Sequence, residues 1–259
     1  MHDFALHRPR SLSEATAQFT SGGEAAYLAG GHTLIPAMKS RLRMPDALVD
    51  LSGLGLAGIA RDADRLWIGA MTRHADVAAG ATAIPALACL AAGIGDAQVR
   101  NRGTLGGSVA NNDPAADYPA AVLALDAVIE TDRATHAADD FFQGMFSTAL
   151  ADGEIITRIG FAIPQAAAYA KFRHPASRYA IVGVFVARFA GESSDAWRVA
   201  VTGAGPGVFR WTDAEAALAA GRDGPAMPAD DLNSDIHAGA DYRAHLCGVM
   251  LKQAVANLA

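Results

Sequence analysis

The chain has 259 residues, of which 51% are hydrophobic and 19% charged, so it can bury a sizeable core and we expect two domains. Its formal net charge of −6 argues against a nucleic-acid partner, since phosphate binding needs a basic surface. The N-terminus lacks the basic region and long apolar run of a signal peptide, and no apolar run reaches membrane-spanning length, which predicts a cytoplasmic protein.

Metal-ligating residues are sparse and scattered. The two cysteines, Cys89 and Cys247, lie far apart in apolar stretches and form neither a disulfide framework nor a C-x-x-C metal site. The eight histidines include no pair at metal-ligand spacing. We therefore expect no metal in this chain, which lacks the four thiolates that an iron–sulfur cluster requires.

The first part of the chain alternates short strands and helices. Ser11 and Glu14 have the spacing of a capping box at a helix start, and Thr72 is expected to cap a second, short helix. In chain order we predict a helix at 12–20, a strand at 25–29, a helix from Thr33, strands at 47–51 and 65–70, helices at 72–78, 84–99 and 119–125, and extended segments at 128–131 and 154–163.

Composition changes around Pro164, after which the predicted strands are longer. Thr212 and Glu215 form a second capping-box pattern, which predicts a helix to about residue 220. In chain order we predict strands at 169–173, 181–189 and 197–202, that helix, a loop at 221–239 rich in Pro, Gly and Asp, and a closing helix at 241–258.

Two glycine-pair loops mark the candidate binding site. Gly30 and Gly31 separate a predicted strand from a predicted helix, and Gly106 and Gly107 repeat the arrangement. A backbone without Cβ atoms turns sharply and lies close to a ligand, and the unpaired N–H groups of a helix start favour an anion. Two such loops would hold the two phosphates of one dinucleotide.

Polar residues around the second loop fit the same interpretation. Thr104, Ser108 and Asn111 offer donors to phosphate, and Asp117 is placed to accept from ribose hydroxyls. The alternatives are that the first loop is a tight turn without a ligand, and that Asp117 is an exposed cap of the helix at Pro119.

With these loops the chain resembles the FAD-binding medium subunit of molybdenum-containing hydroxylases, most nearly the carbon monoxide dehydrogenase type. The resemblance covers nearly the whole chain. It rests on the segments AGGHTLIPAMK (29–39), RGTLGGS (102–108), NNDPAADYPA (111–120), KFRHPASRYAIVG (171–183) and YRAHL (242–246).

The resemblance implies an α+β fold with two domains. Residues 1–163 would form an FAD-binding domain of two α/β subdomains, about 1–55 and 56–163. Residues 164–259 would form a flavoprotein C-terminal domain of antiparallel sheet plus helices.

The resemblance also implies which residues hold FAD. Residues on the two loops would wrap the pyrophosphate, namely Ala29, Gly30, Gly31, His32, Thr33, Thr104, Leu105, Gly106, Gly107 and Ser108. Asn111 and Asp117 would touch phosphate and ribose, Ile155 would lie by the flavin ring, and Tyr179 would cover one face of that ring. Binding is non-covalent in this group, although some more distant flavoproteins of this fold attach FAD to a histidine, which leaves His32 as the covalent alternative.

The implied function is electron transfer within a complex. A large subunit would hold the molybdenum cofactor and choose the substrate, and a small subunit would carry [2Fe–2S] clusters. The FAD of this chain would pass electrons to an external acceptor such as a quinone, NAD or oxygen, and no catalytic side chain is predicted. Two alternatives stay open: a flavin-free scaffold subunit of the same complex, and a stand-alone flavin oxidase.

Overall fold

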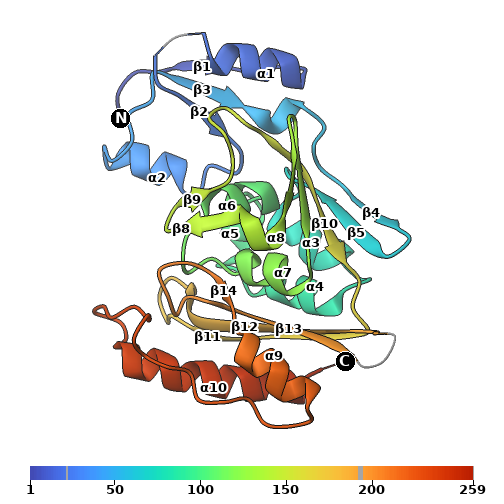
Figure 1. Cartoon of the computed structure of the whole chain (residues 1–259). Coiled ribbons are helices and arrows are strands. Elements are labelled where there is room, and N and C mark those ends of the chain that lie inside the picture. The colour runs from blue at the N-terminus through green and yellow to red at the C-terminus, as the bar shows by residue number, and fades with distance from the viewer. Residues whose placement is uncertain (22, 192–194, 259) are drawn as a thin grey trace.

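The computed structural model describes residues 1–21, 23–191 and 195–258. Figure 1 shows three units stacked along one direction, with the N-terminal unit at one end and the C-terminal unit at the other. The mixed α+β fold is confirmed, with three separate sheets and a short two-stranded ribbon among the described residues.

The N-terminal unit is a small parallel sheet with two helices. Its strands lie in the order β1-β3-β2 and all pair in parallel. The predicted helix cap at Ser11 is confirmed, because its hydroxyl accepts from the Glu14 N–H at 3.1 Å, although the Glu14 carboxylate accepts from the Arg10 N–H at 2.8 Å and not from that of Ser11. The elements are β1 (Ala5–His7), α1 (Leu12–Phe19), β2 (Ala25–Leu28), α2 (Leu34–Lys39), β3 (Ala47–Asp50) and the 3-10 turn η1 (Leu51–Gly53).

The middle unit is an antiparallel sheet in the order β4-β5-β10-β6-β7, covered by helices. The strands are β4 (Ile59–Asp62), β5 (Arg65–Gly69), β6 (Val128–Thr131), β7 (Thr135–Ala137) and β10 (Ile156–Ala162), with β8 (Phe142–Gly144) and β9 (Ser147–Thr148) as a separate ribbon. The helices are α3 (His74–Gly80), α4 (Pro85–Ala92), α5 (Ala97–Arg100), α6 (Leu105–Asn111), α7 (Tyr118–Ala124) and α8 (Ala138–Phe141).

The C-terminal unit is an antiparallel sheet in the order β11-β12-β13-β14. Its elements are β11 (Ala166–Arg173), β12 (Ala180–Phe189), β13 (Ala196–Thr202), β14 (Phe209–Arg210), α9 (Thr212–Ala219) and α10 (Ala240–Ala256). Helix α10 packs on one face of this sheet, and α4 and α7 pack on the other (Figure 1).

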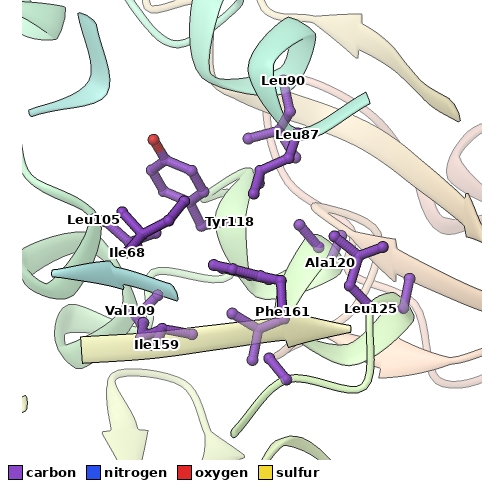
Figure 2. Close-up of a cluster of buried hydrophobic side chains, with 14 of the residues drawn as sticks. Ile68, Leu87, Leu90, Leu105, Val109, Tyr118, Ala120, Leu125, Ile159 and Phe161 are labelled. Carbon is purple, nitrogen blue, oxygen red and sulfur yellow. The ribbon is translucent and has the colours of Figure 1, made fainter. Parts of the chain in front are cut away.

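The largest core lies between the middle sheet and its helices. Figure 2 shows Leu87 of α4, Tyr118 of α7 and Phe161 of β10 gathered in this buried cluster. Phe185 of β12 belongs to the same buried cluster, so the middle and C-terminal units share one core. The boundary between domains at 163 and 164 stays a prediction, as does the division at 55 and 56.

The predicted single helix at 84–99 is wrong. Helix α4 ends at Ala92, and α5 starts only at Ala97. Gly95 between them has φ +47°, a left-handed conformation that interrupts a helix and suits glycine. The Asp96 side chain then caps α5 by accepting from the Val99 N–H at 2.9 Å.

Two predicted caps are also wrong. The Thr72 hydroxyl bonds the backbone of Gly58, and α3 begins two residues later at His74. At the start of α9, Glu215 pairs with Arg210 and accepts from the Val199 N–H, and so does not close a capping box. In both places a tertiary hydrogen bond replaces the local one that the spacing suggested.

Among the described residues, no helix is long and apolar enough to span a membrane. The same residues contain no group of three His, Cys, Asp or Glu side chains that could hold a metal ion.

Candidate functional site

A cleft of about 620 Å³ runs along the junction of the three units. Its volume falls in the range of about 300–1,000 Å³ that is usual for cofactor sites. Of the residues predicted to hold a cofactor, all but Leu105 line it: Ala29, Gly30, Gly31, His32, Thr33, Thr104, Gly106, Gly107, Ser108, Asn111, Asp117, Ile155 and Tyr179. Leu105 is fully buried and packs in the main core.

The two glycine loops touch each other at the centre of the cleft. A Cβ atom added at Gly30 would lie 2.4 Å from the Arg102 carbonyl oxygen, so the loops approach as closely as backbone allows. Gly31 has φ +74°, the left-handed conformation that lets the chain turn from β2 into α2. Glycine is therefore required at both positions by geometry.

The first loop presents donors that the protein does not use. Among the described residues, the N–H groups of Gly31, His32 and Thr33 have no hydrogen-bond acceptor, although all three residues line the cleft. Unpaired N–H groups in a turn of this kind form a concavity that favours an anion. The phosphate-binding interpretation of this loop fits the structure.

The second loop is different, because its N–H groups are already paired. The N–H groups of Leu105 and Gly106 donate to the carbonyls of Thr72 and Ala70 at 3.0 and 2.8 Å, and that of Gly107 donates to the Thr104 hydroxyl at 3.2 Å. The expectation of unpaired donors at this helix start is wrong. These bonds fix the loop against the end of β5, and its small residues provide close approach instead of N–H donors.

Asp117 is buried, which overturns the alternative of an exposed cap. Its carboxylate accepts from the Tyr169 hydroxyl at 2.6 Å, and the Lys171 ammonium lies 2.9 Å from Oδ1 and 3.1 Å from Oδ2. Burial raises the pKa of the Asp117 carboxyl, and the Lys171 ammonium opposes that rise because it favours the carboxylate. Contact with a ribose stays a prediction for this residue.

His74 lines the cleft and was missed at the level of sequence. Its ring packs beside Tyr118, with centroids 5.3 Å apart, and a Cβ atom at Gly103 would lie 2.4 Å from its Nε2. Burial, reinforced by the nearby charges of His32 and Arg100, lowers the pKa of His74 to about 4, so the imidazole is neutral at pH 7. A single histidine at a predicted helix start did not indicate in the sequence that this side chain is buried beside the cleft.

Ile155 and Tyr179 lie on walls that come from different units. Ile155 is 2% exposed and packs in a cluster with Val49 and Leu51 of the N-terminal unit. Tyr179 is 45% exposed and is the last residue of the loop that joins β11 to β12. Arg178 and Ser177 of the same loop also line the cleft, and sequence reasoning did not single them out.

Comparison with known proteins identifies the family of the chain. The sequence model of a family described as FAD binding domain in molybdopterin dehydrogenase matches residues 2–166. The chain is 35% identical to the carbon monoxide dehydrogenase medium chain of Hydrogenophaga pseudoflava, with 97% of this chain and 96% of that one covered. It is 33% identical to the nicotine 6-hydroxylase medium subunit of Paenarthrobacter nicotinovorans, with 95% and 94% covered.

Solved structures give the same result. A chain of reconstituted CO dehydrogenase from Oligotropha carboxidovorans superposes with a TM-score of 0.88 at 32% identity. The superposition covers 98% of this chain and 97% of that chain. The similarity therefore extends through all three units, beyond the residues that the family model matches.

Proposed function

We propose that this chain, which belongs to the FAD-binding medium subunits of molybdenum hydroxylase complexes, is the electron-transfer subunit of such a complex. FAD, when bound, supplies redox chemistry that connects the [2Fe–2S] clusters of a small partner subunit with an external acceptor. The large partner subunit would hold the molybdenum cofactor and select the substrate. A quinone, NAD and oxygen are all candidate acceptors.

The observation that carries the proposal is the set of unpaired N–H groups on the first loop. Gly31, His32 and Thr33 present these groups on the wall of a cleft large enough for a cofactor. We assign them to the FAD pyrophosphate, because its oxygen atoms can accept hydrogen bonds from N–H groups that have no acceptor within the protein. The donors come from the backbone, so the His32 imidazole is not needed for binding.

The second loop would shape the same site by close approach. Gly106 lets the loop pack on Ala70, where an added Cβ would lie 2.5 Å from the Ala70 Cβ, and Gly107 lies beside the first loop, where an added Cβ would lie 3.4 Å from the Ala29 Cβ. The Ser108 hydroxyl and the Asn111 amide add polar groups to the same wall. The second loop would therefore orient the cofactor, whereas the N–H groups of the first loop would bind its negative charge.

We assign no catalytic side chain. Among the described residues of the cleft, the two buried carboxylates are already paired, Asp117 with Lys171 and Tyr169, and Glu154 with His136 and Thr131. The protein's contribution would be to bind FAD, orient it and exclude water. The scaffold alternative is not favoured, since a scaffold needs neither touching glycine loops nor unpaired N–H groups.

A titration of the full chain with FAD tests this placement. In Gly31→Asp a side chain enters a left-handed position and its Cβ lies 2.9 Å from Ile35 Cδ1, so the loop must shift, and a negative charge is added to the loop proposed to hold phosphate. The matched control is Gly248→Asp, the same change on α10 with no other atom within 4 Å of the added Cβ.

We expect Gly31→Asp to lose FAD binding and Gly248→Asp to keep it, with both variants folded by circular dichroism. A folded Gly31→Asp chain that binds FAD as tightly as the unsubstituted protein would remove the first loop from the site.

A further inference from the structure

The loop at residues 174–179, which joins β11 to β12, forms one wall of the cleft. Ser177, Arg178 and Tyr179 line the cleft from this side. Within the loop, the N–H of His174 donates to the Tyr179 carbonyl at 2.8 Å, and that of Arg178 donates to the His174 carbonyl at 2.9 Å. Residues 175–179 are exposed, so the position of the loop depends on a few anchors to the rest of the protein.

Lys171 is the strongest of these anchors. Its side chain is 8% exposed, and its ammonium donates to the Arg178 carbonyl of the loop and the Gly93 carbonyl after α4, both at 3.0 Å. The third contact is the Asp117 carboxylate at 2.9 Å. An ammonium has three N–H donors, so these contacts use its full capacity.

The groups that receive these bonds are themselves fixed. Asp117 immediately precedes α7, lies 5% exposed, and is also held by the Tyr169 hydroxyl of β11. Gly93 follows α4, and Arg178 adds a bond of 3.2 Å to the neighbouring carbonyl of Gly95. The loop is thus tied to both helices that border the C-terminal sheet.

A buried charge makes this arrangement sensitive to change. Hydrogen bonds to charged groups are stronger than neutral ones, and removal of one partner leaves the other buried without compensation. Arg178 has φ +62°, a left-handed conformation that a non-glycine residue adopts at a cost. Its carbonyl is held in that conformation by Lys171.

We propose that Lys171 is a positioning residue that holds the 174–179 loop, and with it Tyr179, against the FAD cleft. This inference rests on the proposed placement of FAD in that cleft. Lys171 acts through the loop, and the bond to Asp117 fixes where the ammonium lies. Without Lys171 the loop would move away from the cleft and expose the cofactor.

Hydrogen exchange in the FAD-free full chain tests the first half of this claim. We expect Lys171→Met to speed exchange of the His174 and Arg178 amides by at least about tenfold. A change of this size corresponds to the loss of about one hydrogen bond to a charged group. With FAD added, iodide quenching of flavin fluorescence should rise, because the loop no longer covers the site. The double variant Asp117→Asn with Lys171→Met removes both buried charges and should show the same loop exchange in a more stable fold.

Arg198→Met is the matched control. Arg198 of β13 also joins the C-terminal sheet to the middle unit, through the Leu123 carbonyl at 3.0 Å and Asp126 at 2.9 Å, but it is far along α7 from the loop. We expect it to leave exchange at His174 and Arg178 unchanged.

Two results would overturn the proposal. One is equally fast loop exchange in the Lys171 and Arg198 variants, and the other is unchanged loop exchange in Lys171→Met. Weaker FAD binding together with unchanged exchange would make Lys171 a direct ligand of FAD. If instead the proposed placement of FAD is wrong, Gly31→Asp will bind FAD normally. The hydrogen-exchange results do not depend on that placement, because they are measured without FAD.

Discussion

The ammonium of Lys171 lies 2.9 Å from the carboxylate of Asp117, and this buried pair joins the C-terminal sheet to the helix α7 beside the FAD cleft. Both side chains are at most 8% exposed. The pair therefore links the stability of the fold to the geometry of the site, because neither partner can be removed without leaving a charge in a low-dielectric environment.

Lys171→Met should lower the free energy of unfolding by about 3–5 kcal/mol, the range for breaking a buried ion pair. Adding Asp117→Asn should recover much of that loss, since the unpaired carboxylate is then gone. Urea unfolding of the single and double variants measures this coupling. Simple additivity of the two substitutions would show that the pair contributes no interaction energy.

Acid should destabilise the protein through His74. Its pKa is lowered to about 4 in the folded state, so the unfolded chain takes up a proton below about pH 6.5 and the folded protein does not until near pH 4. The free energy of unfolding should fall by up to about 3 kcal/mol as pH drops through this window, and the contribution is absent at pH 7.

The variant His74→Gln should show a correspondingly smaller loss between pH 7 and pH 4, measured by urea unfolding at each pH. The control is His245→Gln, an exposed histidine on α10. Identical pH profiles for the His74 variant and the unsubstituted protein would contradict the assignment of this acid sensitivity to His74.

Contact between the two glycine loops should be sensitive to a single methyl group. In Gly30→Ala the added Cβ would lie 2.4 Å from a backbone oxygen, so the loops must separate, and we expect a loss of about 1–3 kcal/mol in stability with weaker FAD binding. Gly248→Ala places the same methyl group in open space on a helix and should stabilise by up to about 1 kcal/mol. Thermal unfolding and FAD titration compare the two variants.

FAD should be released by acid, because the proposed contact of His32 is its backbone N–H. His32→Ala keeps that N–H and should retain the cofactor, and acid precipitation of either protein should leave the yellow colour in the supernatant. Colour in the pellet of the unsubstituted protein, but not of His32→Ala, would instead indicate a covalent bond to this histidine.

Sequence patterns predicted the parts of the fold that depend on local signals. The helix cap at Ser11, the strand before Gly30, and the long strands of the C-terminal sheet follow from spacing and periodicity, and the structure confirms them. The residues indicated by the glycine pairs and by the resemblance, except Leu105, line one cleft. Glycine pairs are informative because glycine is the residue that adopts left-handed conformations and close backbone approaches at little cost.

Tertiary contacts explain what the sequence did not reveal. The break between α4 and α5 depends on Gly95, and the carbonyls of this segment are held by Arg100, Arg178 and Lys171. Lys171 is separated from Asp117 by more than fifty residues, and no local pattern indicates that they meet. The same holds for His74, whose neutrality follows from burial against Tyr118 and Gly103.

The most direct test of the central claim is the absorbance spectrum and flavin-to-iron ratio of the complex purified from its native host, with and without Gly31→Asp. We expect flavin and iron–sulfur absorbance together with larger and smaller partner chains in the unsubstituted complex. With Gly31→Asp the flavin should be lost while the iron–sulfur absorbance and the partner chains remain. A Gly31→Asp complex that keeps its full flavin content, or an unsubstituted complex without flavin, would contradict the assignment of this chain as the FAD-carrying electron-transfer subunit.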